Sequence, residues 1–401
     1  MKAPSCTVQA THMSDAASRL PWSAGCFLSA ANFLNQFPSP IRMKTKSLLL
    51  GLALCAAFRF CGAAPNNEFG IDVRRLSPRA AMFYGDPWNN AILALATSQG
   101  LVVMDSSWSG TVASGFREAI QTEFKRSDFA CLINTHEHTD HIGGNEAFAG
   151  LPIVGHESVR QMMLQAMADP AVKAKWRGFS AEQEIAKLRD HYGKIAPKFL
   201  DSPAYAGLVK CYRAMEADFH GSHVLVPPTI TFDRRMTLHM GDLTIRLRYF
   251  GGFHSVGDTI ISIPEENLVM IGQLFFSRGV PVASQRLAES TTPQMVDNWF
   301  VVLREVLAET DENTRFLTCS QRQIMGQAEC QRFYAYLEQL WNGVRRAKAG
   351  GKTFEQCCAA LPLQDFSEMA KQPNESLRGT EWEILDVHRQ NIGFFWKVLE
   401  K

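Results

Sequence analysis

The 401-residue sequence has no excess of charge of either sign. Its 41 lysines and arginines nearly balance 40 aspartates and glutamates, which leaves a formal net charge of +1. No basic stripe with interleaved aromatic residues and no block of like charge occurs along the chain. Internal repeats and low-complexity tracts are also absent. The composition therefore gives no indication of a nucleic-acid or other polyanionic partner.

The cysteines form no recognisable disulfide pattern. Cys131 falls in an apolar run, where a thiol behaves as a small hydrophobic side chain. The adjacent residues Cys357 and Cys358 would bond to each other only with strain. A chain of this size does not depend on disulfides, so we assign none. Six of the ten cysteines lie beyond residue 64: Cys131, Cys211, Cys319, Cys330, Cys357 and Cys358.

The sequence also lacks an apolar run that would span a membrane well. The run Ser47–Phe58 is short and is followed at once by Arg59. Lys44 and Lys46 precede it, and the small residues of Cys61-Gly62-Ala63 come after it. A basic start, a short apolar centre and small residues at the end are the parts of a secretory signal peptide.

We therefore predict a signal peptide over residues 43–64 and an exported protein, periplasmic or secreted, with no stable membrane span after cleavage. Residues 1–42 lack clear periodicity and contain many loop-forming residues. They are predicted to be a disordered upstream extension from a misassigned start codon. Neither Cys55 nor Cys61 follows the small residue that lipid attachment needs. An internal helix of the fold is the alternative interpretation of residues 43–64.

The most informative segment is the hexapeptide His136–His141, which reads HEHTDH. Imidazole and carboxylate are ligands that suit Zn²⁺ and related ions. His136 and His138 are two residues apart, so an extended backbone turns both side chains to the same side. Asp140 and His141 follow, where Gly143-Gly144 allow a sharp turn into a helix. One segment is thus able to supply ligands to two adjacent ion sites.

The setting of the hexapeptide supports this interpretation. Phe129–Thr135 is a short apolar run with the length of a buried strand. Loops that follow such strands carry the chemistry of many α/β proteins. The alternative is a set of exposed polar loop residues without a metal, which three clustered histidines disfavour.

The hexapeptide resembles the H-x-H-x-D-H signature of the metallo-β-lactamase superfamily. Leu101–Asp105 is similar to the early strand of that family, which ends in a structural aspartate, here Asp105. Gly251–Ile260 resembles the segment that supplies the next metal-binding histidine, here His254. The similarity runs from about residue 80 to about residue 325. It implies an α/β fold, the four-layer αββα metallo-β-lactamase sandwich.

Around this core, hydrophobic patterning predicts the remaining elements. We expect the superfamily domain over residues 65–330, a helical insertion at about 156–228 and a C-terminal helical extension over 331–401. The insertion is equally compatible with a cap on the substrate pocket and with a packing or oligomer-forming appendage. Strands are predicted at 91–97, 101–105, 129–135, 151–154, 236–240, 243–250, 258–263 and 267–271, and helices at 111–124 and 330–344, with a capping box formed by Thr353 and Gln356.

The resemblance implies a first metal site made by His136, His138 and His254. A catalytic zinc keeps three protein ligands and leaves a fourth position for water. Water bound there ionises near pH ~7 and supplies a hydroxide nucleophile. In this site Asp140 is expected to accept a proton from the water or to orient it.

The second site of the family departs from its pattern in this chain. Asp140 and His141 are present, but Gln273 stands where relatives have a bridging aspartate, and Ser320 stands where they have a final histidine. A neutral amide is a weak ligand for a divalent ion. Cys319 would be a strong soft ligand, but it is one residue out of register, and neighbours on an extended chain point apart. One zinc ion is therefore expected rather than two, with iron as the alternative metal.

These residues predict an exported, metal-dependent hydrolase of a small-molecule substrate. Gln273 and Ser320 would then stabilise an oxyanion or a substrate carboxylate. Two alternatives stay open. The first is an oxidoreductase similar to the mononuclear-iron persulfide dioxygenases of the superfamily, and the second is a non-catalytic binding protein that retains the fold.

Overall fold

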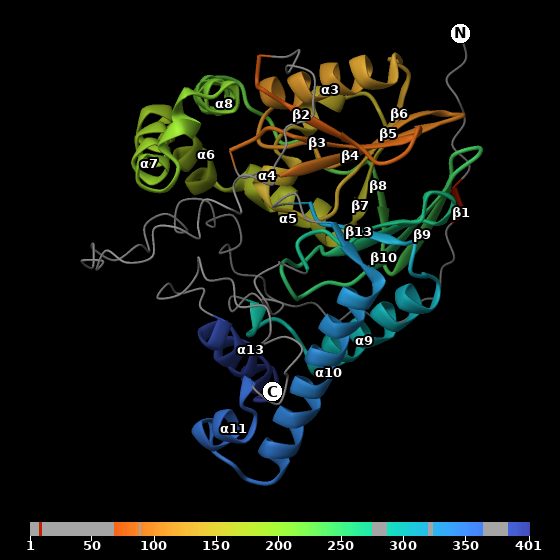
Figure 1. Cartoon of the computed structure of the whole chain (residues 1–401), viewed down its shortest axis with the longest axis vertical. Helices are drawn as coiled ribbons and strands as arrows, with labels where there is room; N and C mark the ends of the chain where they lie inside the picture. The colour runs from red at the N-terminus through yellow and green to blue at the C-terminus, as the bar shows by residue number, and fades with distance from the viewer. Residues whose placement is uncertain (1–7, 10–67, 88–89, 275–286, 320–323, 364–383) are drawn as a thin grey trace.

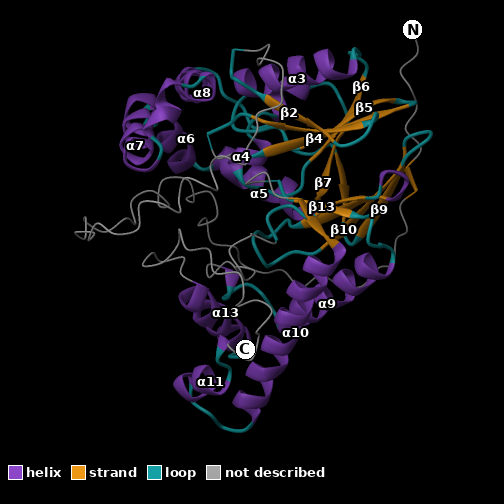
Figure 2. Cartoon of the chain, viewed as in Figure 1, coloured by secondary structure: helices purple, strands orange, loops and turns teal. Residues whose placement is uncertain are grey.

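The computed structural model describes residues 8–9, 68–87, 90–274, 287–319, 324–363 and 384–401. Two seven-stranded sheets lie face to face in the middle of the molecule, and helices cover their outer faces (Figures 1 and 2). This arrangement confirms the predicted αββα sandwich. The predicted signal peptide lies outside the described residues. Of residues 1–42, only the short strand β1 (Val8–Gln9) is described, and it pairs with β9 at the edge of the second sheet.

The first sheet places two parallel strands next to each other with their carboxyl ends at the same edge. These are β5 (Gly100–Met104) and β6 (Phe129–Ile133), and both are almost entirely buried. Asp105 follows the first strand and the hexapeptide follows the second. The sheet order is β2-β3-β4-β5-β6-β7-β8, and the other strands are β2 (Asp72–Arg75), β3 (Ala80–Tyr84), β4 (Ala91–Thr97), β7 (Ile153–His156) and β8 (Ile230–Phe232).

The second sheet carries the His254 loop between two of its central strands. That loop connects β10 (Thr244–Tyr249) to β11 (Thr259–Ile263), which pair antiparallel. The strands predicted at 236–240 and 243–250 correspond to β9 and β10, which pair antiparallel. The sheet order is β1-β9-β10-β11-β12-β13-β14, and the other strands are β9 (Arg235–His239), β12 (Leu268–Met270), β13 (Arg315–Leu317) and β14 (Ile324–Gly326).

Apolar side chains from the inner faces of both sheets form the core between them. Alternate residues of a strand point to one face, so each strand contributes two or three side chains to this layer. The first sheet supplies Met82, Leu93, Val102 and Ile133, among others, and the second supplies Leu238, Ile245, Leu247, Ile261 and Met270.

Helix α3 (Gly110–Phe124) covers the outer face of the first sheet, and the C-terminal helices cover the second. The C-terminal helices share one apolar core with α9, in which Trp299 stacks on Phe394 with ring centroids 5.9 Å apart. The capping box of Thr353 and Gln356 is confirmed. The helices of this layer are α9 (Pro293–Ala308), α10 (Gln327–Ala349), α11 (Phe354–Ala360) and α13 (Ile384–Val398).

The predicted insertion is helical and lies beside the first sheet (Figure 1). It contains four α-helices. Its last helix is tied to α3, because the Asp218 carboxylate accepts hydrogen bonds from the backbone and hydroxyl of Thr111. The helices are α5 (Glu157–Ala168), α6 (Pro170–Arg177), α7 (Ala181–Ile195) and α8 (Pro203–His220).

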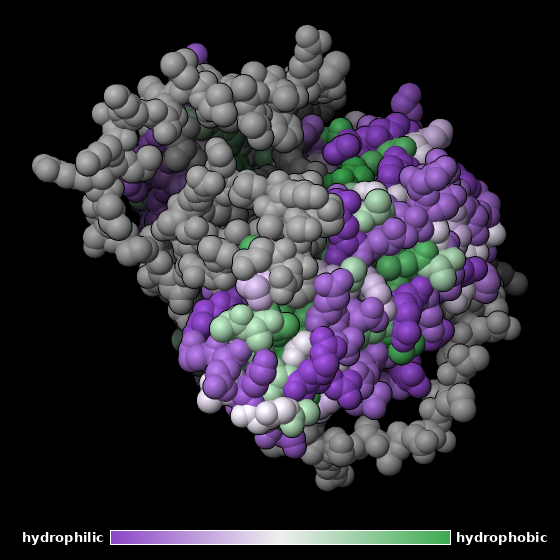
Figure 3. All heavy atoms as spheres, turned by 60° about the horizontal axis from the view of Figure 1, so that its bottom comes forward, coloured by the Kyte–Doolittle hydropathy of each residue, from purple (hydrophilic) through white to green (hydrophobic). Residues whose placement is uncertain are grey.

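The described residues on the face shown in Figure 3 are largely hydrophilic. On the face shown in Figure 3, hydrophobic side chains occur in small groups between hydrophilic ones. The large hydrophobic side chains that stand exposed among the described residues are Leu164, Val224 and Val301. Within the same part of the chain, no helix combines the length and the apolar character that a membrane crossing requires.

Candidate metal centre

The hexapeptide follows the carboxyl end of β6 and passes from extended backbone into a helix. His138 is extended, and the one-turn helix α4 (Thr139–Ile142) follows it. Gly143 and Gly144 come after this helix rather than leading into it, and both have ordinary negative φ values, so glycine is needed here because the backbone of another loop approaches closely. A Cβ on Gly143 would lie 2.0 Å from the Trp108 carbonyl oxygen, and one on Gly144 would lie 2.0 Å from that of Ser106.

His136, His138 and His254 come together as predicted for the first site. Each offers a ring nitrogen, and these atoms all lie within 4.8 Å of one another. His138 Nδ1 is 3.2 Å from His254 Nε2. His136 Nε2 is buried and has no hydrogen-bond partner among the described residues. An ion between the three rings would give this orphaned nitrogen a partner, so the residues present fit a metal.

The protonation of His136 also suits a ligand. Burial lowers its pKa well below the usual value, and the neighbouring histidines His141, His138 and His254 lower it further. Its Nδ1 lies 2.9 Å from the Thr135 hydroxyl. A proton on Nδ1, donated to that hydroxyl, leaves the lone pair of Nε2 facing the site. Neutral imidazole in this tautomer is the form that binds metal.

Glu137 and Asp258, which the sequence did not single out, hold the His254 loop in place. Glu137 accepts hydrogen bonds from the backbone of Val256 (3.0 Å) and Gly257 (2.9 Å). Asp258 accepts the backbone N–H of His254 at 2.8 Å, together with those of its two neighbours in sequence. Burial raises the pKa of Asp258 to about 7, although hydrogen bonds from Ser255 oppose the shift. The two carboxyl groups fasten the third histidine to the loop of the first two.

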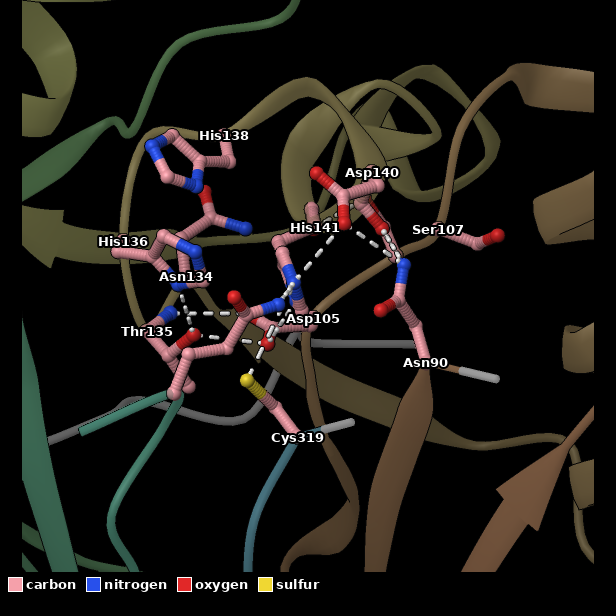
Figure 4. Close-up of polar contacts among 12 residues, drawn as sticks. Asn90, Asp105, Ser107, Asn134, Thr135, His136, His138, Asp140, His141 and Cys319 are labelled. Carbon is pink, nitrogen blue, oxygen red and sulfur yellow. Dashed lines mark hydrogen bonds and ion pairs between the residues drawn. The ribbon is translucent and has the colours of Figure 1, made fainter. Parts of the chain in front are cut away.

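Asp105 orients two histidines of the centre, His136 through Thr135 and His141 directly. It accepts hydrogen bonds from the backbone and the hydroxyl of Thr135, both at 2.8 Å. Its Oδ2 also lies 2.9 Å from His141 Nδ1. The Thr135 hydroxyl contacts His136, so the network joins both histidines (Figure 4). Asp105 was predicted to be structural, and these contacts show what it supports.

Three groups surround Nε2 of His141, whose side chain is fully buried. Asp140 Oδ2 lies 3.3 Å away, the Gln273 amide nitrogen 2.8 Å and Cys319 Sγ 4.0 Å. Burial disfavours the imidazolium, but Cys319, Asp140 and Asp105 outweigh it and raise the pKa of His141. An amide can turn either its NH₂ or its oxygen toward this nitrogen. Gln273 is thus able to bond His141 in either protonation state.

The Cys319 side chain faces the centre. The expectation that it would point away from the metal site, because it is one residue out of register, is therefore wrong. The strand β13 ends two residues earlier, so the alternation of an extended chain no longer applies at Cys319. Its thiol is fully buried, and burial raises its pKa to about 11 although His141 opposes the shift. Ser320 lies outside the described residues.

Asn90 is a further residue of the centre, and no pattern in the sequence points to it. Its amide Nδ2 donates to Asp140 Oδ2 at 3.0 Å and to the Asp140 carbonyl at 3.2 Å. Burial raises the pKa of the Asp140 carboxyl, but the effects of His141, His138 and Asn90 are larger and hold it well below the usual value. The second group of ligand types that comes together is Asp105, His136, His141 and Cys319.

The remaining histidines of interest have structural contacts. His388 packs among the C-terminal helices, since it is 5% exposed and lies 2.8 Å from the Leu361 carbonyl. The His223 side chain is buried, and its Nδ1 lies 3.1 Å from Glu146. His220, by contrast, is exposed.

Together, the sandwich and the converging histidines define an αββα protein with a candidate metal centre. The profile of the Metallo-beta-lactamase superfamily matches residues 85–313, more than half of the chain. The chain belongs to this superfamily.

Individual relatives match shorter parts. A segment is 32% identical over 98 residues to the 2,4-dinitroanisole O-demethylase subunit alpha of Nocardioides sp. (strain JS1661), covering 23% of this chain and 30% of that protein. Another is 34% identical over 76 residues to the Metallo-beta-lactamase type 2 of Bacillus cereus, covering 19% and 29%. The matches thus span less than a third of these relatives. Among solved structures, a metallo-beta-lactamase from Pontibacter korlensis is similar at 15% identity with a TM-score of 0.40, covering 65% of this chain and 95% of that one.

Proposed function

We propose that the protein is an exported hydrolase that cleaves a small molecule with one metal ion, zinc rather than iron, held by His136, His138 and His254. The observation that carries the proposal is the convergence of three ring nitrogens within 4.8 Å, one of them buried and without a hydrogen-bond partner among the described residues. Membership of a superfamily rich in metal-dependent hydrolases supports it.

When bound to three imidazoles, zinc supplies Lewis-acid activation of water near neutral pH. The chain supplies the remaining groups. Asp140 takes up the proton that the attacking water loses and returns it to the leaving group. The Gln273 amide donates a hydrogen bond to the negative charge that develops on the substrate. Glu137 and Asp258 keep the His254 ring in position during the reaction.

Gln273 is the main support for one ion rather than two. Its amide nitrogen lies 2.8 Å from His141 Nε2, the atom that a second ion would need. A neutral amide does not offset the charge of two adjacent divalent ions, whereas a carboxylate does. Cys319 lies at a longer distance from the same nitrogen.

Metal analysis of the pure protein tests the ion count. We expect one zinc per chain, loss of that zinc in His254→Ala, and retention in His239→Ala, whose exposed histidine lies on β9. Gln273→Asp should raise the content to two, because a carboxylate would replace the amide between the two positions. Two ions in the unaltered chain would contradict the single-ion centre, and stoichiometric iron would contradict zinc.

A panel of four probes tests the reaction class. It comprises 4-nitrophenyl acetate, a chromogenic cephalosporin, a thioester and 2,4-dinitroanisole. The second and fourth follow the names of two relatives. We expect hydrolysis of at least one probe, abolished by a chelator and restored by zinc. Turnover that survives in His254→Ala would show that the activity does not come from this centre.

A further inference from the structure

We propose that Asn90 is a positioning residue that fixes the Asp140 carboxylate for proton transfer. The inference rests on the proposed function, because it assigns Asp140 as the base. Asn90 directly precedes β4, and the hexapeptide follows β6. Because β5 lies between these two strands, the Asn90 side chain reaches the hexapeptide across the end of β5. Asn90 is not one of the candidate metal ligands, so it acts only through Asp140.

Asn90 holds Asp140 at two points. One amide nitrogen donates to the carboxylate Oδ2 at 3.0 Å and to the backbone carbonyl of the same residue at 3.2 Å. The side chain of Asp140 is 19% exposed, so it keeps access to solvent at one side. Two bonds from one amide fix both the backbone and the carboxyl plane of Asp140.

Asn90 is itself held in place by hydrogen bonds through Asp86. Its backbone N–H donates to Asp86 Oδ1 at 2.8 Å, and the Ser107 hydroxyl donates to Asp86 Oδ2 at 2.9 Å. Asn90 is 2% exposed, and Asp86 is 1% exposed. The Ser107 carbonyl in turn accepts a hydrogen bond from the Gly144 backbone at 3.0 Å, just after the hexapeptide. The position of Asn90 is therefore fixed independently of Asp140.

The amide oxygen of Asn90 gives the second, independent observation. It is buried and has no hydrogen-bond partner among the described residues. A buried acceptor without a partner lowers the stability of the folded state. An apolar side chain of similar size would avoid this cost, so packing alone does not account for an asparagine here. The NH₂ group is the useful half of this side chain, and it contacts Asp140.

The two carboxylate oxygens of Asp140 therefore have different roles. Oδ2 is shared by Asn90 and His141, at 3.0 Å and 3.3 Å. The other oxygen points away from Asn90, toward the side of the centre where His138 lies (Figure 4). Hydrogen-bond donors on Oδ2 reduce its affinity for a proton. The proton from the attacking water therefore goes to the other oxygen, and it leaves with the departing group.

Asn90→Leu provides the sharpest test, because leucine has a similar volume and removes both hydrogen bonds. With the most rapidly cleaved probe of the panel and zinc-loaded protein, we expect kcat to fall about 10–100-fold, in keeping with the cost of a misplaced catalytic group. KM should stay within about threefold, and the zinc content should stay at one. The Tm should equal or exceed that of the unaltered protein, because the orphaned oxygen is gone.

Asn391→Leu is the matched control. Asn391 is fully buried and donates to the Tyr336 hydroxyl in the C-terminal helices, at 3.1 Å. This variant should lose Tm and keep kcat. A structural role for Asn90 would give the same pattern in Asn90→Leu, a lower Tm with kcat unchanged, and that result would overturn the inference.

Crystal structures of the unaltered protein and Asn90→Leu give a readout that needs no substrate. We expect the Asp140 carboxylate to rotate away from its original position in the variant. An unmoved carboxylate would contradict the inference. If the unaltered protein cleaves no probe, the proposed function fails, but these two structures still decide whether Asn90 positions Asp140.

Discussion

Asp105 shows how backbone conformation and a buried carboxylate combine at one residue. Its φ is 66°, a value that is uncommon for residues other than glycine and that is often found where function requires it. This conformation directs the carboxylate to Thr135 and His141 at the same time. Such supporting groups fix the tautomer and the orientation of metal-binding histidines.

Asp105→Asn is therefore expected to weaken zinc binding about 10–100-fold, the usual effect of losing a group that orients a ligand. Thr135 and His141 present three hydrogen-bond donors to the Asp105 carboxylate. An asparagine amide would turn its own NH₂ donor toward one of them, and that hydrogen bond would be lost. Competition with a fluorescent chelator measures the affinity. Asp242→Asn is the control, since the half-exposed Asp242 bonds Arg79 and the Ser98 backbone. An affinity within twofold of the original for Asp105→Asn would rule out the orienting role.

His156 carries a pH prediction away from the centre. It is 6% exposed and stacks on Tyr249, its Nε2 lies 2.6 Å from the Asp233 carbonyl, and its Nδ1 accepts from the Ser158 backbone. Burial lowers its pKa from 6.5 to about 4, although the bond to Asp233 opposes the shift. Protons then bind preferentially to the unfolded chain below pH 6.5. Its contribution to stability is present above that pH and is lost as the pH falls toward 4.

The full loss corresponds to about 3 kcal/mol. We expect the free energy of unfolding to fall more steeply between pH 7 and pH 4 in the unaltered protein than in His156→Gln, whose side chain does not titrate. Urea unfolding at several pH values measures both curves, and carboxyl groups common to the two proteins cancel in the difference. Parallel curves would show that the ring does not stay neutral in the folded state.

The candidate ligands were predictable because their spacing is local. His136 and His138 share a face of one extended segment, and the same alternation turns Glu137, between them, the other way. Cys319 was predictable as a ligand type but not in its orientation, and no pattern pointed to Asn90. Their roles depend on where separate loops meet, and hydrogen bonds across such distances leave no pattern in the sequence.

At the scale of elements, the turn after α4 depends on two glycines. Gly144→Ala would place a Cβ 2.0 Å from the Ser106 carbonyl and 2.4 Å from the Ala113 side chain. We expect a loss of at least about 2 kcal/mol in the free energy of unfolding, because a backbone oxygen cannot move aside cheaply. Zinc content should fall with it, since the Asp140 and His141 loop must shift. Gly326→Ala, where a Cβ meets nothing within 4 Å, is the control for thermal and urea unfolding. Equal stability of the two variants would contradict the close packing.

The long apolar strands and the amphipathic helices were predicted well, because their periodicity is strong. No strand was predicted at β2 or β3, nor at the short strands β8, β13 and β14. Each of these last three has three residues, too few for a period to show. They form through pairing with neighbours in the sheets rather than through their own patterns.

At the scale of the whole molecule, the insertion and the C-terminal helices were predicted as helical but not as docked. The insertion is fastened by Asp218 to Thr111 and leads into the buried His223, which contacts Glu146. The C-terminal helices contribute Trp341 and Phe395 to the same core as α9. Docking depends on partners far apart in sequence, so the periodicity of a helix predicts its apolar face without predicting what covers it.

Export is the prediction that concerns the molecule as a whole, and it rests on residues 43–64. Expression of the full chain in a Gram-negative bacterium should give periplasmic protein whose intact mass fits cleavage near Ala63. Leu49→Arg should block export, because a charged residue in the apolar centre of such a segment costs about 2.5–3.5 kcal/mol on insertion. Leu164→Arg, at an exposed position of α5, should leave export unchanged. Cytoplasmic protein that retains residues 43–64 would favour the alternative, an internal helix of the fold.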